Sequence, residues 1–206
     1  MNALFLIVIG SLCGLANALT IPLSAREPHF DARSRHLPMR LVGMQSISQT
    51  SNDDVINFYD TVYATNMTIG GQDLLIQLDT GSSDLWVSLP SGQFEFTNVT
   101  DITAQETYGI GAVTGTIVFA NASLGDHFVY NQAFINATNA TDFGTIFGDN
   151  VRGILGLSFD AGSTVDVDVV EAFGANSTAG VSFLVNLFLQ NPNMSHFFTT
   201  QLGRTD

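Results

Sequence analysis

The segment spanning residues 78–87 reads LDTGSSDLWV, and it constrains the fold more than any other part of the chain. An apolar run delivers the carboxylate of Asp79 into a turn at Gly81, where glycine allows a tight backbone path, and a second apolar run follows. A carboxylate at the end of a buried strand is unfavourable unless it is hydrogen-bonded, and the hydroxyls of Thr80 and Ser82 can donate to it. The segment predicts two strands joined by a turn that holds Asp79. For the Asp-Thr-Gly triplet alone, an ordinary Asx turn is the simpler interpretation.

Short β-type runs separated by Gly, Asn, Asp and Ser continue through the rest of the chain. The expected strands are 57–69, 74–78, 84–88, 92–97, 112–119, 128–135 and 153–157. One helix is expected over residues 165–173, with Ser163 or Thr164 as its N-cap, and Gly174 marks its end. A second is expected over 181–190, where apolar residues recur at helical spacing before a proline. The sum is an all-β domain with small helices.

The first 18 residues have the features of a secretory signal peptide. Residues 3–15 are mostly apolar and carry no charge, and the sequence Ala16-Asn17-Ala18 matches the small-x-small pattern of a signal peptidase site. The apolar run is short for a membrane span, so an uncleaved anchor is the weaker interpretation. The sequence therefore predicts a secreted, extracellular protein with no membrane contact after signal cleavage.

Seven Asn-x-Ser/Thr sequons agree with secretion, because such sites are glycosylation acceptors in secreted proteins. A single sequon arises easily by chance, but seven in a chain with a signal-like N-terminus indicate a glycosylated surface. The candidate sites are Asn66, Asn98, Asn121, Asn136, Asn139, Asn176 and Asn193.

Charge is distributed unevenly along the chain, which has no lysine. Four of its six arginines lie between residues 26 and 40, whereas two arginines and seventeen acidic residues follow from residue 52 onward. Such an acidic region disfavours a nucleic-acid partner and suits work at low pH, where carboxylates are partly protonated. Residues 19–51 are polar, Arg-rich and contain three prolines, so they are interpreted as a basic propeptide with an approximate boundary. The alternative is a basic tail without function.

The chain has few residues of the types that bind metal ions or form disulfides. The single cysteine, Cys13, lies in the predicted signal peptide, so no disulfide is expected in the mature chain. The four histidines show no metal-ligand spacing. Asp166 and Asp168 stand near the start of a predicted helix, where the helix dipole favours acidic residues. Neither a metal nor another cofactor is expected.

Several further motifs follow the Asp79 segment in the chain. They are TYGIG at 107–111, VTG at 113–115, GILGL at 153–157, NLF at 186–188 and FFTTQL at 197–202. Together with LDTGSSDLWV, these motifs resemble the N-terminal lobe of the pepsin-like aspartic endopeptidases, from about Phe58 to Gly203. The resemblance implies an acid protease lobe built as a double-psi-type β-barrel.

The resemblance also implies which residues carry the chemistry. In this family, one aspartate from each of two lobes holds a water molecule, and the two carboxylates share a proton over an acidic range. Asp79 matches the first-lobe catalytic aspartate. Thr80, Gly81 and Ser82 match its supporting turn, with Ser82 expected to hydrogen-bond the outer oxygen of Asp79.

The hairpin motif matches the flap that closes over bound peptide in this family. Tyr108 is implied to be the flap tyrosine, and the indole N–H of Trp86 is its expected hydrogen-bond partner. Gly81 and Gly109 are expected to lie along the substrate backbone. The implied substrates are peptides and proteins, and the basic propeptide matches the prosegment that covers the acidic cleft in zymogens.

A second Asp-Thr-Gly or Asp-Ser-Gly does not occur before Asp206. We therefore expect residues 52–206 to be one lobe of a secreted acid endopeptidase whose C-terminal lobe is missing, and the isolated lobe to be inactive. One alternative is a homodimeric protease in which each copy supplies Asp79. The other is a non-catalytic secreted glycoprotein that binds peptides or a protease.

Overall fold

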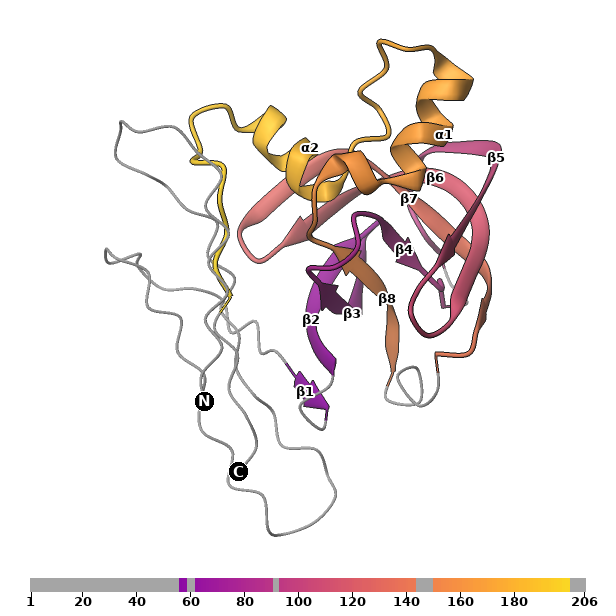
Figure 1. Cartoon of the computed structure of the whole chain (residues 1–206). Helices are drawn as coiled ribbons and strands as arrows, with labels where there is room; N and C mark the ends of the chain where they lie inside the picture. The colour runs from indigo at the N-terminus through magenta and orange to yellow at the C-terminus, as the bar shows by residue number, and fades with distance from the viewer. Residues whose placement is uncertain (1–55, 59–61, 91–92, 144–149, 201–206) are drawn as a thin grey trace, which may run out of the picture.

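The computed structural model describes residues 56–58, 62–90, 93–143 and 150–200 (Figure 1). The strands are β1 (Ile56–Phe58), β2 (Val62–Ile69), β3 (Gln72–Asp79), β4 (Leu85–Val87), β5 (Phe96–Thr107), β6 (Ala112–Leu124), β7 (His127–Thr141) and β8 (Val151–Gly156). The helices are a 3-10 turn at Asp160–Gly162, α1 (Thr164–Phe173) and α2 (Phe183–Gln190). The predicted signal peptide (1–18) and propeptide (19–51) lie outside the described residues.

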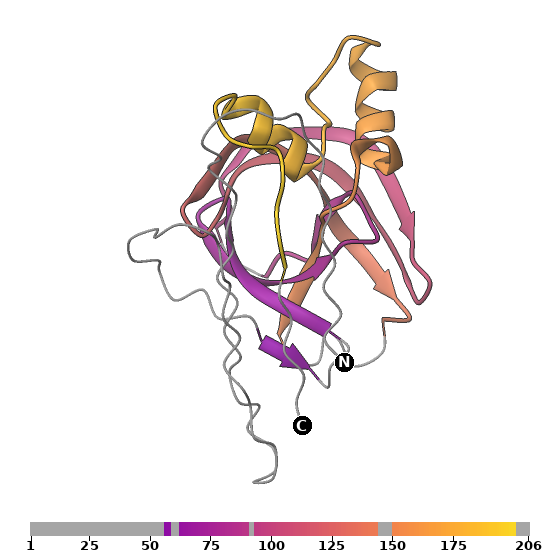
Figure 2. The ribbon, with the colours of Figure 1, turned by 60° about the vertical axis from the view of Figure 1, so that its left-hand side comes forward.

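The strands form a closed barrel. Their order in the sheet is β1-β2-β3-β8-β4-β7-β6-β5, and β2 also pairs with β6 through Thr68–Ser123 and Ile69–Ala122. The run of strands from β2 to β6 in this order therefore closes on itself, and Figure 2 shows the resulting ring. The structure confirms the expected mostly β fold, built as a closed barrel with two small helices.

Strand β8 is inserted between β3 and β4, which are consecutive in the chain. It runs parallel to β3 and antiparallel to β4. Residues 80–84, which join β3 to β4, therefore cross the end of β8 at Gly156. A Cβ atom at Gly156 would lie 2.4 Å from the carbonyl carbon of Ser83, so this crossing needs glycine.

Side chains on the two faces of the strands enter two separate hydrophobic cores. Along β4, Leu85 and Val87 belong to the first core and Trp86 belongs to the second. Val118 and Ile117 of β6 alternate in the same way. Because both faces are buried, these strands are continuous apolar runs in the sequence rather than alternating ones.

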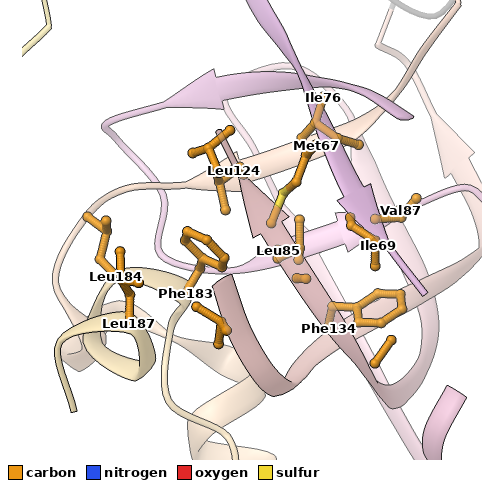
Figure 3. Packing of buried hydrophobic residues seen from close by; sticks show 14 of the residues in the cluster. Met67, Ile69, Ile76, Leu85, Val87, Leu124, Phe134, Phe183, Leu184 and Leu187 are labelled. Atoms are coloured by element: carbon orange, nitrogen blue, oxygen red, sulfur yellow. The ribbon is translucent and has the colours of Figure 1, made fainter. Parts of the chain in front are cut away.

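The first core fills the barrel, and α2 closes one end of it (Figure 3). Phe183 and Leu187 of α2 are fully buried among barrel side chains such as Leu124. The second core lies on the other face of the sheet, where Val165 and Val169 of α1 are buried. Both helices lie at the same end of the barrel in Figures 1 and 2.

The expected strands 57–69 and 92–97 differ most from the observed ones, and the other expected strands differ only in their bounds. The expected strand 57–69 is divided into β1 and β2. The prediction of a strand at 92–97 is largely wrong, because only Phe96 and Thr97 belong to a strand and residues 93–95 do not. The polar residues after Thr97 were not predicted as a strand, but they extend β5 to Thr107 because β5 pairs along β6.

The helices begin and end where capping residues stand. Helix α1 starts one residue earlier than expected, and the Ser163 hydroxyl accepts a hydrogen bond from the Asp166 N–H (2.8 Å). Gly174 ends α1 with a φ of 105°. Helix α2 starts two residues later than expected, and Ser182 stands at its N-cap position without a side-chain capping hydrogen bond. Within the FFTTQL motif, Phe198 and Thr199 form an isolated β-bridge.

Among the described residues, no helix is both long enough and apolar enough to cross a membrane.

Candidate active site

Asp79 is the last residue of β3 and is half-buried. Its backbone carbonyl accepts a hydrogen bond from the Leu157 N–H (2.8 Å), which fixes the end of β3 against the residue that follows β8. Its side-chain Oδ1 accepts a hydrogen bond from the Gly81 N–H (2.9 Å). The turn thus holds one carboxylate oxygen and leaves the group at the edge of the barrel rather than inside it.

The turn after Asp79 is tied to the segment that follows β8. The Ser82 carbonyl accepts a hydrogen bond from the Ser158 N–H (2.9 Å), and the Ser83 hydroxyl donates to the Phe159 carbonyl (2.6 Å). The Ser82 hydroxyl is buried and has no hydrogen-bond partner among the described residues. The expected hydrogen bond from Ser82 to Asp79 is therefore not formed in this structure, and Ser82 is held through its backbone instead.

Asp84, at the end of the same turn, is only 2% exposed. Its Oδ1 accepts a hydrogen bond from the Ser163 hydroxyl (2.5 Å), and its Oδ2 accepts from the backbone N–H groups of Thr164 (2.7 Å) and Val165 (3.3 Å). These donors form the first turn of α1, where the helix dipole also favours a negative charge. Asp84 therefore joins the Asp79 turn to helix α1.

The flap, defined here as residues 107–112, joins β5 to β6. The Tyr108 N–H donates to the Gly111 carbonyl (2.9 Å), and Thr107 pairs with Ala112. Gly111 has a φ of 86°, and a Cβ there would lie 2.7 Å from the Thr141 carbonyl, so the turn needs glycine at this point. Ile110 at the tip is 64% exposed.

Tyr108 is held by an aromatic cluster under the flap. The centroid of its ring lies 5.6 Å from that of Phe143, which lies 5.3 Å from that of Trp86. Burial raises the pKa of the Tyr108 phenol, and the charge of Glu106 raises it as well. The phenol therefore keeps its proton in neutral and acidic solution. The Tyr108 hydroxyl is buried and has no hydrogen-bond partner among the described residues, so the expected hydrogen bond with the Trp86 indole is not formed in this structure.

Asp79 and the flap share one cleft of about 710 Å³. Its lining combines the Asp79 turn, the flap, and the segment from Ser158 to Gly162. The described lining residues are Asp79, Gly81, Ser82, Ser83, Glu106, Thr107, Tyr108, Gly109, Ser158, Phe159, Ala161 and Gly162. The structure therefore brings a carboxylate, the flap and a turn of the backbone together around one hollow, as in ligand-binding sites of proteins.

The cleft also contains Glu106, which the sequence analysis missed. Burial raises the pKa of the Glu106 carboxyl to about 8, and the nearby Asp84 side chain raises it as well. The signal was present in the sequence, because Glu106 lies two residues after Ala104 and four after Ile102. These positions of β5 face inward at the two-residue period of a strand.

The remaining predicted residues lie near the cleft or far from it. Thr80 is exposed and Trp86 is fully buried, and neither lines the cleft. Among the seven sequons, Asn136 is half-buried in β7 and the other six asparagines are exposed. In the part of the chain that the structure describes, no three His, Cys, Asp or Glu side chains gather as they would around a metal ion.

A family model described as eukaryotic aspartyl protease matches residues 62–175, which is more than half of the chain and includes both the Asp79 turn and the flap. The chain belongs to the eukaryotic aspartyl protease family. This confirms the resemblance to pepsin-like aspartic proteases stated from the sequence.

Several named aspartic proteases are similar to this family member. Cathepsin D of Dictyostelium discoideum is 29% identical, over 93% of this chain and 51% of that protein. Vacuolar protease A of Aspergillus fumigatus is 30% identical, over 64% of this chain and 40% of that protein. Podosporapepsin of Podospora anserina is 36% identical, over 53% of this chain and 30% of that protein. The chain thus spans about half, or less, of the length of these relatives.

Among solved structures, an aspartic proteinase from Irpex lacteus is similar, with a TM-score of 0.47 and 25% sequence identity, over 64% of this chain and 37% of that one.

Proposed function

We propose that this chain supplies one half of the catalytic site of an acid endopeptidase, with Asp79 as one of two catalytic carboxylates. The observation that carries the proposal is the position of Asp79, which stands at the end of β3 in the cleft that it shares with the flap. The substrates are peptide bonds of proteins. The named relatives, all aspartic proteases, support this reaction class.

The chemistry needs two carboxylates that share a proton. One takes a proton from a bound water as the water oxygen attacks the peptide carbonyl carbon, and the other, protonated, hydrogen-bonds the carbonyl oxygen. The amide nitrogen then receives a proton and the C–N bond breaks. Asp79 can act in this way because one of its oxygens is held by the Gly81 N–H.

Glu106 also lines the cleft. The side chains that act on its carboxyl are those of Asp84 and Thr164, so we do not propose Glu106 as the second carboxylate. The described residues of the cleft include no second aspartate that could face Asp79. We propose that the partner comes from a second lobe or from a second copy of this chain.

We also propose that the protein is secreted, glycosylated and made as a zymogen. The signal-like residues 1–18 and the arginine-rich residues 19–51 support secretion and a prosegment. The exposure of six sequon asparagines supports glycosylation of the folded surface.

The test is hydrolysis of a denatured protein by the purified chain between about pH 3 and pH 5, where an aspartate pair holds one proton. The assay compares the parent chain with Asp79→Asn and with Asp101→Asn, a matched change at an exposed aspartate of β5. Hydrolysis that rises with the square of chain concentration and is lost only in Asp79→Asn supports a site completed by a second copy.

A peptide that binds the cleft without being cleaved would show that the second carboxylate is not supplied by a copy of this chain, and the non-catalytic binding role would then stand. Binding is measured by fluorescence polarisation of a labelled peptide, with Tyr108→Ala as the flap variant. If the purified chain neither hydrolyses nor binds peptides, that result contradicts the proposed function.

A further inference from the structure

A β-bulge in β7 turns an aromatic side chain to solvent. The pairing of β6 with β7 shifts register between Ala120 and Ala122, so Asn121 alone stands opposite both Tyr130 and Asn131. Two residues of one strand that face a single residue of the next form a bulge, and bulges re-aim the side chains that they carry. The Tyr130 side chain is 66% exposed at this point, far more than a tyrosine in a barrel strand needs to be.

Polar side chains from three elements hold this bulge in place. The Gln190 side chain of α2 accepts a hydrogen bond from the Tyr130 N–H (2.9 Å) and donates one to the Tyr130 carbonyl (2.9 Å). From β6, the Asn121 Oδ1 accepts from the Asn131 N–H (3.1 Å), and from β5 the Thr97 hydroxyl donates to the Asn131 Oδ1 (2.6 Å). The backbone that carries Tyr130 is therefore fixed although its ring is exposed, and a fixed ring loses little freedom when a ligand covers it.

Tyr130 and Phe128 form an aromatic pair at the edge of a hollow of about 450 Å³. The centroids of the two rings lie 4.5 Å apart, and Phe128 is 43% exposed. The hollow lies between the aromatic pair, the turn from β6 to β7 and the end of α2. Its described lining residues are Asp126, His127, Phe128, Tyr130, Leu187, Gln190 and Asn191. Its volume and its mixture of rings with a few polar groups are those of small-molecule sites.

The lining favours a neutral ligand that carries hydroxyl groups. The rings offer apolar faces against which the C–H groups of a sugar can pack, and the Asp126 carboxylate and the His127 imidazole can exchange hydrogen bonds with hydroxyls. A purely apolar ligand would leave these polar groups without partners. An anion is disfavoured, because Asp126 stands at the rim and only two arginines oppose seventeen acidic residues from residue 52 onward. A sugar meets these conditions.

The chain itself can deliver a sugar to the hollow at Asn121. This exposed asparagine begins the sequon Asn121-Ala122-Ser123, and its Oδ1 is held by the Asn131 N–H, which leaves the Nδ2 atom for an N-linked glycan. Opposite residues of antiparallel strands have Cβ atoms about 5 Å apart, so such a glycan begins beside Tyr130. A tethered sugar is present at a high effective concentration, and weak contacts with an open hollow are then enough.

We propose that the hollow seats the first sugars of an N-linked glycan on Asn121, which pack over Tyr130 and Phe128 and hold the β6–β7 hairpin against α2. The inference rests on the proposed glycosylation and is independent of the proposed catalysis. In the glycosylated protein the aromatic pair is removed from water, so the glycan stabilises the fold.

The test is the thermal stability of the full chain secreted from a cell that adds N-linked glycans, after mass spectrometry of glycopeptides has reported the occupancy of Asn121. Ser123→Ala removes the acceptor sequence but keeps Asn121 and its hydrogen bond. We expect it to lower the melting temperature by about 2–4 °C, the shift expected for a modest surface contact in a domain of this size. Asn66→Gln removes a sequon at an exposed residue of β2 outside the hollow, and should leave the melting temperature close to that of the parent.

A double-mutant cycle ties the loss to the aromatic pair. Tyr130→Ser removes the ring that the glycan covers, so adding Ser123→Ala to it should cause no further fall. Ser123→Ala in a chain produced without glycans measures any direct effect of the serine. A fall that is the same with and without the glycan, or with and without the Tyr130 ring, overturns the proposal. A melting temperature that rises with chain concentration only while Tyr130 is present would show that a second copy covers the pair, and also overturns it.

A free sugar gives a measurement that does not depend on stability. The probe is N,N′-diacetylchitobiose, the disaccharide that begins an N-linked glycan, and saturation-transfer NMR records its contact with the protein. The signal should appear with Ser123→Ala, in which the hollow is empty, and be lost in the glycosylated parent and in the Ser123→Ala, Tyr130→Ser double variant. Equal signals with the parent and Ser123→Ala would show a site for free sugars, and no signal with any of the three would exclude a sugar site; either result overturns the proposal.

The occupancy measurement separates this inference from the proposed function. A chain that carries glycans at other sequons but none at Asn121 would overturn the inference and leave the proposed glycosylation standing. A secreted chain without a glycan at any sequon would overturn both, whereas the proposed catalysis is tested by hydrolysis alone.

Discussion

At the scale of single residues, the strongest polar anchor is Asp84, which satisfies a hydroxyl and two N–H groups at the start of α1. We predict that Asp84→Ala lowers the free energy of unfolding by about 3 kcal/mol, because buried donors are left without an acceptor and hydrogen bonds to a charged group are the stronger kind. Urea unfolding followed by circular dichroism measures this. Asp101→Ala, at an exposed aspartate of β5, should change it by less than about 0.5 kcal/mol.

A loss of unfolding free energy in Asp84→Ala no larger than in the Asp101 control would show that α1 does not depend on this carboxylate.

The sequence pointed to Asp79 because its motif is long and specific. Asp84 stands in the same motif, but its partners in α1 lie about eighty residues away in the chain. Glu106 was missed because residues 98–107 were not predicted as a strand, and the two-residue period that turns Glu106 inward with Ala104 applies only to a strand.

At the scale of elements, α2 closes the barrel with side chains that are fully buried. We predict that Phe183→Ala lowers the free energy of unfolding by about 3–5 kcal/mol, because it leaves a cavity in the first core beside Leu187. Leu189→Ala on the same helix is the matched control, since this side chain is 58% exposed and should cost less than about 0.5 kcal/mol. Equal losses in the two variants would mean that α2 does not seal the core as described.

Elements whose cause is local were predictable, and those whose cause is distant were not. The helix bounds followed from Ser163 and Gly174, which are neighbours of the helix they cap. The outer half of β5 is polar and reads as a loop, and only its pairing with β6 makes it a strand. The closure of the barrel through β2 and β6 depends on residues more than fifty positions apart, which no local pattern records.

At the scale of the whole molecule, excess negative charge makes stability depend on pH. The unfolded chain releases the Glu106 proton near the ordinary value of 4.5, whereas the folded chain holds it to about 8. Between these values the folded state binds more protons, so raising the pH favours unfolding. The raised pKa values of Asp166 and Asp168 act in the same direction from their ordinary value of 3.8 upward. His127 opposes them, because burial lowers its pKa, so stability rises as the pH increases toward the ordinary histidine value of 6.5.

We therefore predict that the melting temperature of the chain is highest in mildly acidic solution and falls between about pH 5 and pH 8, because the acidic groups outnumber the one opposing histidine. Differential scanning calorimetry at constant ionic strength measures the profile. Glu106→Gln should flatten the fall, since its side chain does not titrate, whereas His127→Gln should steepen it by removing the group that opposes it. A melting temperature that rises steadily from pH 5 to pH 8 in the parent chain would contradict the argument. A fold whose core and flap are most stable where its acids hold their protons is suited to the acidic conditions under which an aspartate pair catalyses hydrolysis.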